Sequence, residues 1–381
     1  MSGRLHVALV APGGLGPDGQ HRTIPALRDL VIDLARDADV EVFLLRQERE
    51  AVSYDAFGAK IHAVGEPAPG RAVRVRGTLR LLHALRRVHK RKPFDLFHGL
   101  WTQESGAAAA IAARLTGRNA VASVMGGELE AMPEIGFGGE SSAFGRRMNR
   151  LCLDLAARVT AGSEPIEETL RARLQGDPRG RIVRAPLGID TSLFLPHPHP
   201  ERHTPLLLAA GSINRVKDHE SLFEAFRRVR RKRPARLLVA GEDTLQGELE
   251  LKTREAGLTS ELVWFGFALP REMPALYAEA DLFVHTSRFE SQGVVLLEAA
   301  ASGLPIVSTA VGIAQEMERA GAARIVRPAD PDHIADEIVR LLDDPAARAA
   351  LGEKARLFAA GFDRTITSAK FLEIYQELRR E

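Results

Sequence analysis

Residues 281–305 read DLFVHTSRFESQGVVLLEAAASGLP, and this stretch decides the fold. A short apolar run at 281–284 is typical of a strand buried in a parallel sheet. After a polar loop, apolar residues return at the spacing of a helix that opens near Gly293, and Gly303 with Pro305 predicts its end. Strand, loop and helix in this order form a βα unit, which predicts a doubly wound α/β fold.

The loop and the start of the helix carry groups that suit a sugar nucleotide. The first N–H groups of a helix favour an anion, and a glycine at 293 lets a ligand oxygen approach the backbone. Glu290 and Glu298 can accept hydrogen bonds from hydroxyl groups. Two carboxylates eight residues apart are more often solvated, but Glu298 lies between Leu297 and three alanines, where a carboxylate needs a partner.

These residues resemble a known family motif. Segments 289–293 and 297–299, followed by 303–307, are similar to the Glu-x7-Glu motif of family-four retaining glycosyltransferases of the GT-B fold. The resemblance covers most of the chain. It implies two Rossmann-like α/β domains with parallel sheets facing across a cleft, and a C-terminal helix that crosses back to the N-terminal domain. It also implies that the donor is bound by Glu290, Gly293, Val294 and Glu298, with Glu290 taking part in catalysis.

Length and composition limit the alternatives. The 381 residues exceed what one core usually organises, and 45% of them are hydrophobic, so two domains are expected. A net charge of +2 does not indicate a nucleic acid partner. A single cysteine, Cys152, excludes an internal disulfide and suits a reducing compartment. No apolar run approaches about 18 residues and no signal peptide is recognisable, so we expect a cytoplasmic protein.

The clearest break in composition is the proline- and histidine-rich stretch 195–204. It predicts a linker between an N-terminal acceptor-side domain, 1–194, and a C-terminal donor domain, 205–364. The final segment, 365–381, is predicted to be the helix that joins the first domain. Histidines in an exposed linker seldom bind a metal, and neither a metal site nor a cofactor is predicted.

A glycine loop follows the first predicted strand. Gly14, Gly16 and Gly19 spell G-x-G-x-x-G after that strand, so a dehydrogenase must be considered. A dinucleotide site also needs an acidic residue at the end of the second strand, but that strand ends in Arg46, which disfavours an oxidoreductase. The family resemblance places Gly19 next to the diphosphate of the donor instead.

Two cations follow the first strand of the second domain, in the turn 211–218. Each could be a solvated surface charge. In the family an arginine and a lysine clasp the leaving diphosphate here. Lys217 matches the lysine, whereas Ser212 occupies the usual arginine position. We therefore predict that Arg215 replaces the arginine and that Arg215 and Lys217 together stabilise the leaving group.

The turn at 125–130 departs from the family pattern. Many relatives have a histidine before the glycine, and this sequence has Met125. A thioether neither donates nor titrates, so the polar role is predicted to pass to Glu128 or to the amides of Gly126 and Gly127. The alternative is a structural loop in a protein that binds nucleotide sugars without transferring them.

A basic segment, 71–92, contains nine Lys or Arg residues (seven Arg and two Lys) and no acid. Leu79, Leu82 and Leu85 form an apolar stripe at helical spacing. Such a helix can contact the inner face of an anionic membrane or an anionic acceptor. The alternative is a solvated helix whose stripe packs on its own sheet.

The sequence thus predicts a metal-independent retaining hexosyltransferase. It would move a sugar from a UDP-, GDP- or ADP-sugar to a sugar, lipid-linked or small-molecule acceptor, as in cell envelope or polysaccharide biosynthesis. Two alternatives stay open: another GT-B activity, such as epimerisation or hydrolysis, and a nucleotide-sugar-binding protein without transfer activity.

Overall fold

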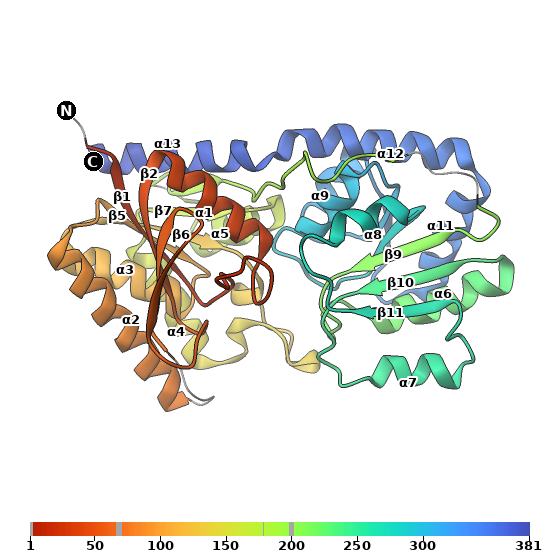
Figure 1. Cartoon of the computed structure of the whole chain (residues 1–381), viewed down its shortest axis with the longest axis horizontal. Helices are drawn as coiled ribbons and strands as arrows, with labels where there is room; N and C mark the ends of the chain where they lie inside the picture. Colours follow the sequence, from red (N-terminus) through yellow and green to blue (C-terminus); the bar gives the residue numbers. More distant parts are fainter. Residues whose placement is uncertain (1–2, 66–70, 178, 198–201) are drawn as a thin grey trace. The chain divides into compact units, whose positions relative to one another are not determined.

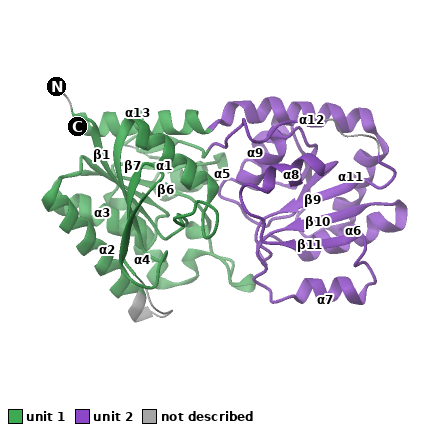
Figure 2. Cartoon of the chain, viewed as in Figure 1, with its two compact units in different colours: residues 1–187, 364–381 green, residues 188–363 purple. Residues whose placement is uncertain are grey.

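The computed structural model describes residues 3–65, 71–177, 179–197 and 202–381, the first three of helix α2 without their side chains. Two compact units make up the chain (Figure 2). Unit 1 consists of the residues up to Leu187 together with Arg364–Glu381, and unit 2 consists of Gly188–Asp363. Figure 1 labels many of the elements of both units.

Unit 1 is built on a sheet of eight strands in the order β3-β4-β2-β1-β5-β6-β7-β8, in which only β3 runs antiparallel to its neighbour. The strands are β1 (Leu5–Ala11), β2 (Ala38–Leu44), β3 (Val52–Ala56), β4 (Ala59–Ala63), β5 (Leu96–Leu100), β6 (Asn119–Val124), β7 (Arg158–Ala161) and β8 (Ile182–Arg184). The helices are α1 (Pro25–Asp37), α2 (Arg71–Arg91), α3 (Glu104–Thr116), α4 (Ala143–Leu155), α5 (Glu164–Arg173) and α13 (Arg364–Arg380). Short 3-10 turns η1 (Gly127–Leu129), η2 (Pro133–Ile135) and η3 (Gly139–Ser141) precede α4.

Both faces of this sheet are apolar, as the continuous hydrophobic run of β1 predicts. Alternate residues of β1 divide between two cores, because successive side chains of a strand point to opposite faces. Val7 and Leu9 pack with α1 and α13, whereas Ala8 and Val10 pack with α2 and α3. The sheet is therefore the middle layer of three.

A buried polar chain fixes α13 to the sheet of unit 1. Nδ1 of His98 lies 2.6 Å from the Tyr375 hydroxyl, and Nε2 lies 2.7 Å from Oγ of Ser123, which in turn contacts Oγ1 of Thr160 at 2.5 Å. Burial lowers the pKa of His98 to about 3, so the ring is neutral and its contacts are ordinary hydrogen bonds. The predicted return of the last helix to the first domain is confirmed.

Unit 2 is built on a parallel sheet of six strands in the order β11-β10-β9-β12-β13-β14. The strands are β9 (Leu206–Ala210), β10 (Arg236–Ala240), β11 (Leu262–Gly266), β12 (Leu282–His285), β13 (Ile306–Thr309) and β14 (Arg324–Val326). The helices are α6 (His219–Lys232), α7 (Glu248–Glu255), α8 (Met273–Glu279), α9 (Val294–Ala301), α10 (Ala314–Arg319), α11 (Pro331–Asp343) and α12 (Pro345–Ala359), followed by the 3-10 turn η4 (Ala360–Phe362). Helices α6 and α11 cover one face, and α8, α9 and α12 cover the other.

The division between the units lies before the predicted linker. Backbone N–H of Ile189 donates to the carbonyl of Phe362 at 2.9 Å, and Oγ1 of Thr191 donates to Asp363 at 2.7 Å. Residues from 188 onward therefore pack with the end of unit 2, although the sharpest change in composition comes later. The central part of the predicted linker, 198–201, lies outside the described residues.

The predicted leucine stripe of α2 is wrong. Leu85 is fully buried in the unit 1 core together with Leu81, whereas Leu79 is 61% exposed. The physical reason is helix geometry: each three-residue step falls short of a full turn, so residues six apart are separated by about 120° around the axis. Leu79 and Leu85 consequently face different surroundings.

Candidate active site

Two loops meet at the carboxyl edge of the unit 2 sheet. The turn 211–218 follows β9 and the loop 286–293 follows β12, and these strands are neighbours. The Thr286 hydroxyl donates to the carbonyl oxygens of Lys217 and Asp218 at 3.0 and 3.1 Å, and N–H of Arg288 donates to Val216 at 2.7 Å. The fold therefore brings together the two segments in which the sequence placed the main site residues.

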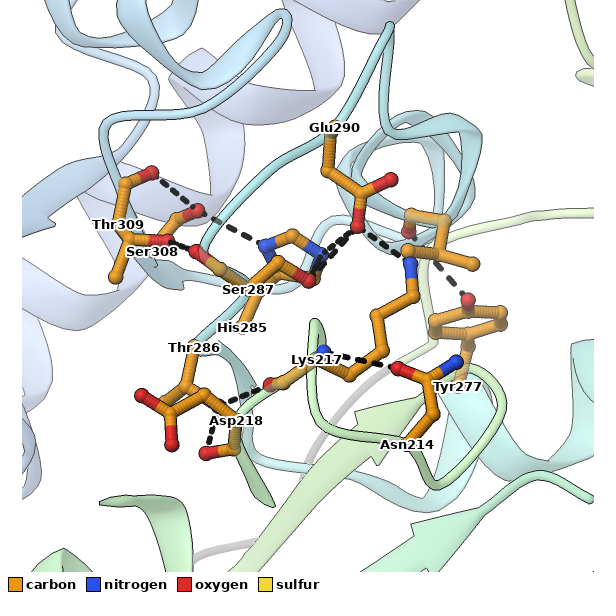
Figure 3. Close-up of polar contacts among 11 residues, drawn as sticks. Asn214, Lys217, Asp218, Tyr277, His285, Thr286, Ser287, Glu290, Ser308 and Thr309 are labelled. Atoms are coloured by element: carbon orange, nitrogen blue, oxygen red, sulfur yellow. Dashed lines mark hydrogen bonds and ion pairs between the residues drawn. The ribbon is translucent and has the colours of Figure 1, made fainter. Parts of the chain in front are cut away.

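Lys217 and Glu290 form an ion pair through Nζ and Oε1 (Figure 3). The same oxygen also contacts Nε2 of His285 at 3.0 Å and accepts from the Ser287 hydroxyl at 2.8 Å. Burial raises the pKa of Glu290, but the Lys217 charge and the His285 hydrogen bond outweigh it and hold the pKa well below its usual range. Glu290 is an anion.

The second oxygen of Glu290, Oε2, points away from these three contacts (Figure 3). It has no hydrogen-bond partner among the described residues, and the side chain keeps 13% of its surface exposed. An ionised carboxylate oxygen in this position can accept a hydrogen bond from a ligand hydroxyl.

Helix α9 begins directly after this loop. Gly293 is its N-cap, with φ of 88°, a left-handed conformation that favours glycine. A Cβ at this position would lie 3.1 Å from Leu296 and 3.6 Å from Cγ of Glu290, so the missing side chain also keeps the start of the helix open. Val294 is the first helical residue. An anion at this end would meet amide groups that have no partner within the helix.

Glu298 lies in the second turn of α9 and is 8% exposed. Its Oε2 accepts a hydrogen bond of 2.8 Å from the hydroxyl of Tyr277, a fully buried residue of α8. The expectation that this carboxylate needs a partner is confirmed. Glu298 and Glu290 thus occupy separate surroundings on α9 and its preceding loop.

The ion pair that Arg215 makes is separate from the Lys217–Glu290 pair. The Arg215 guanidinium is 3.8 Å from Glu248 of α7, and the side chain is 58% exposed. Its predicted role at the diphosphate stays a prediction. A third cation, Arg288, comes from the Glu290 loop, and its Nε lies 3.4 Å from Oδ2 of Asp218, the N-cap of α6.

Unit 1 contains a cavity of about 230 Å³ at the carboxyl ends of β1, β2, β5 and β6. Trp101 and Phe137 supply aromatic walls, and Glu104 lies at its charged end. Glu104 is 3% exposed and pairs at 2.5 Å with both Arg46 and Arg74. Trp101 has a φ of 64°, which is rare for a bulky residue other than glycine.

Glu128 lines the same cavity, but its carboxylate is turned to the backbone. Its oxygens accept from the amides of Met125 at 2.8 Å and Gly126 at 2.7 Å. Burial raises the pKa of Glu128, although the hydrogen bonds from these backbone amides act to lower it. The predicted transfer of a polar role to Glu128 stays a prediction, and the Gly126 amide is already used within the turn.

Gly19 lies in unit 1, in the turn between β1 and α1. Its N–H donates to Gly16 at 3.0 Å, and its carbonyl accepts from Arg28 at 3.2 Å. Its predicted place next to the donor diphosphate stays a prediction, because the donor-side groups Lys217 and Glu290 belong to unit 2.

Sequence reasoning missed His285, Ser287 and Tyr277. His285 directly follows the predicted strand, 281–284, and this position was the available signal, since residues there face a site in open α/β sheets. Nothing in the sequence indicated that Tyr277 of α8 would reach Glu298.

Among the described residues, no three His, Cys, Asp or Glu side chains are grouped as metal ligands. None of the described helices has both the length and the apolar character needed to span a bilayer.

Two α/β units, the second with a lysine–glutamate pair beside a helix N-terminus, define a protein of the GT-B class. A family profile described as "Glycosyl transferases group 1" matches residues 196–358, and one described as "Glycosyl transferase 4-like domain" matches residues 22–188. Together the two profiles match most of the chain. The chain belongs to the glycosyltransferases that they describe, as the Glu-x7-Glu resemblance predicted.

The chain is 32% identical over 239 residues to a protein named D-inositol 3-phosphate glycosyltransferase from Pseudarthrobacter chlorophenolicus. This alignment covers 58% of this chain and 56% of that relative. The chain thus spans about half the length of the curated relatives it matches. Sucrose-phosphate synthase from Thermosynechococcus elongatus aligns over 98% of this chain and 99% of its own, with a TM-score of 0.83 and 19% identity. The structure of HepE of Anabaena, solved with UDP and glucose, aligns over 98% of this chain and 100% of the HepE chain, with a TM-score of 0.76 and 19% identity. These structural likenesses show the fold.

Proposed function

We propose that the protein is a retaining glycosyltransferase that moves a sugar from a nucleoside diphosphate sugar to an acceptor hydroxyl. The observation that carries this proposal is the Lys217–Glu290 pair beside the N-terminus of α9. It offers positive charge for a diphosphate and a carboxylate oxygen for a sugar hydroxyl. The complex of HepE with UDP-glucose supports testing UDP-sugars first.

Each residue has a role in this proposal. As the bond between the anomeric carbon and the diphosphate oxygen breaks, negative charge grows on the diphosphate, and Lys217 with the α9 amides stabilises it. Oε2 of Glu290 accepts from a sugar hydroxyl, and Glu298, held by Tyr277, accepts from the nucleoside. In line with the family resemblance, the acceptor oxygen attacks from the leaving-group side, and its proton passes to the diphosphate.

The cavity of unit 1 is the proposed acceptor site. Its volume of about 230 Å³ is below the roughly 300 Å³ at which drug-sized ligand pockets begin, which suits a small hydroxylated ring. Trp101 and Phe137 can contact the apolar face of such a ring, and the charged groups around Glu104 can bind its hydroxyls. The name of the inositol phosphate relative makes a phosphorylated polyol a reasonable first acceptor to assay.

A thermal-shift screen of UDP-, GDP- and ADP-sugars tests the donor site, because a ligand that binds the folded state raises the melting temperature. The stabilising donor is then incubated with and without acceptors. Transfer establishes the proposed activity. Consumption without transfer identifies a hydrolase or epimerase, and binding without consumption identifies a binding protein, an alternative that Met125 keeps open.

Turnover is expected to be unchanged by an excess of EDTA. The reason is that Lys217 and the amide end of α9 provide the positive charge that a divalent ion would otherwise supply. Steady-state rates with and without the chelator test this expectation. Loss of activity in EDTA that is restored by Mg²⁺ or Mn²⁺ would contradict it.

Glu298→Gln is expected to weaken binding of the free nucleoside diphosphate by about tenfold or more, the worth of a hydrogen bond to a charged group. Glu290→Gln should instead chiefly weaken binding of the intact donor, since its carboxylate is assigned to the sugar. Calorimetry with both ligands separates the two effects. Glu318→Gln, an exposed change on α10, is the matched control. Equal losses of diphosphate affinity in both site variants would count against the assignment.

We also propose that α2 contacts an anionic membrane surface. Leu79 and Leu82 line an open groove of about 620 Å³ with a set of basic side chains: His83, Arg86, Arg87, Lys90 and Arg91. The arginines and the lysine of this set have no ion-pair partner among the described residues. Exposed apolar surface next to uncompensated positive charge suits anionic lipid headgroups.

Cosedimentation with vesicles tests this surface. We expect binding to phosphatidylglycerol-containing vesicles and little binding to pure phosphatidylcholine. Arg86→Glu combined with Arg87→Glu should abolish it, because each basic residue near such a surface contributes about 1 kcal/mol. Arg231→Glu combined with Lys232→Glu on α6 makes the same charge change elsewhere. Equal loss in both double variants would show a general effect of net charge and not a docking surface.

A further inference from the structure

The loop carboxylate Glu290 rests on a buried histidine. His285 is the last residue of β12, and its side chain is 3% exposed. Nε2 lies 3.0 Å from Oε1 of Glu290 and 3.1 Å from Oγ of Ser287, and Nδ1 lies 3.3 Å from Oγ of Ser308 (Figure 3). The ring therefore connects the candidate active-site carboxylate to strand β13.

The hydrogen-bond partners define where protons sit on this ring. An ionised carboxylate only accepts, so the bond to Glu290 places a hydrogen on Nε2. The Ser308 hydroxyl can donate to the lone pair of a neutral Nδ1 at 3.3 Å or to the carbonyl of Thr309 at 2.9 Å. When it donates to Thr309, a second proton on Nδ1 meets the lone pair of the Ser308 oxygen as its acceptor. These proton positions follow from the network of partners.

The charged and titratable groups around the ring act in opposite directions. Burial lowers the pKa of His285, Glu290 raises it through a hydrogen bond and its charge, and Lys217 lowers it again. A further titratable group, His219 at the start of α6, has its pKa lowered to about 3 by burial and is neutral. The Ser308 side of the ring, on β13, is uncharged. With Lys217 on Glu290, His285 is a neutral imidazole.

A diphosphate at Lys217 changes this balance. Its negative charges compensate the charge of Lys217, which opposes a charged imidazole, while Glu290 remains in contact with Nε2. Resting on the proposed function, we propose that His285 takes up a proton from solvent on Nδ1 when a nucleotide sugar binds, and as an imidazolium holds Glu290 in place for the sugar. His285 is then a positioning residue that acts through Glu290, and the proton returns to solvent when the nucleotide leaves.

Calorimetry of donor binding tests the proton uptake directly. The probe is the nucleotide sugar chosen by the thermal-shift screen, whose diphosphate is esterified at both ends and does not titrate near neutral pH. Titrations near neutral pH in two buffers of different ionisation enthalpy give the number of protons bound. We expect uptake of up to one proton per donor. Affinity should then fall with rising pH, by at most about tenfold per pH unit.

Two variants distinguish this role from a structural one. In His285→Gln the side-chain amide can still donate to Glu290 but cannot titrate, so we expect donor binding without proton uptake and without the pH dependence. His219→Gln replaces the neighbouring buried histidine and should retain both. Equal heats in the two buffers for the unmodified protein, or uptake that persists in His285→Gln, overturn the inference. Failure of every nucleotide sugar to bind the unmodified protein would instead overturn the donor site itself.

Discussion

Replacing Lys217 by methionine is expected to lower the rate of sugar transfer by about a hundredfold to a thousandfold, as the removal of one preorganised charge stabiliser does. Lys217 is 19% exposed and already positioned by its contact with Glu290 and by the bond of 3.0 Å from its N–H to Asn214. Methionine keeps the length of the side chain and removes the charge. The loss should appear mainly in kcat, because the charge on the diphosphate grows as the bond breaks.

Lys232→Met is the matched control for this change. Lys232 lies on α6, is 51% exposed and pairs with Asp336 across the surface, where ion pairs contribute about 1 kcal/mol or less. Thermal melts establish that both variants fold. A rate for Lys217→Met within a few-fold of the control would mean that the diphosphate does not use this lysine.

Arg215→Ala is expected to lower kcat on the order of a hundredfold, and Arg215→Lys should also be damaging because lysine lacks the planar fork of donors. The structure places Arg215 on Glu248, but this pair is exposed on both sides and holds the arginine only weakly. Little free energy is therefore needed to turn the guanidinium to a bound diphosphate.

Glu248→Gln and Ser212→Ala are the controls for this experiment. The first removes the partner that holds Arg215 in the structure, and the second changes the position where the family usually has its arginine; both should transfer at close to the normal rate. A near-normal rate for Arg215→Ala itself would show that Arg215 is only a surface charge. Arg288, which lies against Asp218 in the neighbouring loop, would then be the next cation to test.

Local sequence pattern predicted the elements of the fold because each pattern has a local cause. The short runs at 5–11, 158–161, 206–210 and 236–240 coincide with β1, β7, β9 and β10. Gly293 before the helix and Gly303 after it marked both ends of α9, and Asp330 followed by Pro331 is a local pattern typical of the helix start that α11 has there. Helical spacing places Leu222, Phe223, Phe226 and Val229 on one face of α6, and all four are buried.

The contacts of the site could be predicted only in part. The two strands that precede Lys217 and Glu290 are neighbours and end at one edge of the sheet, which accounts for the closeness of the two residues, but spacing does not give the ion pair itself. The contact of His285 with Glu290 and that of Tyr277 with Glu298 depend on side-chain directions that spacing does not give. For Glu128, a carboxylate in the turn after β6 led to the prediction of a polar role in the reaction. In the structure this carboxylate accepts hydrogen bonds from the backbone of its own turn.

The membership of α13 in unit 1 determines the order in which the chain can fold during translation. Phe371, Ile374, Tyr375 and Leu378 complete the core formed by α1 and the first strands, yet the ribosome makes them after all of unit 2. Unit 2 is continuous in sequence and can close its own core as soon as it has emerged. Nascent unit 1 keeps an uncovered apolar strip until α13 has emerged, so the second unit is able to finish folding before the first.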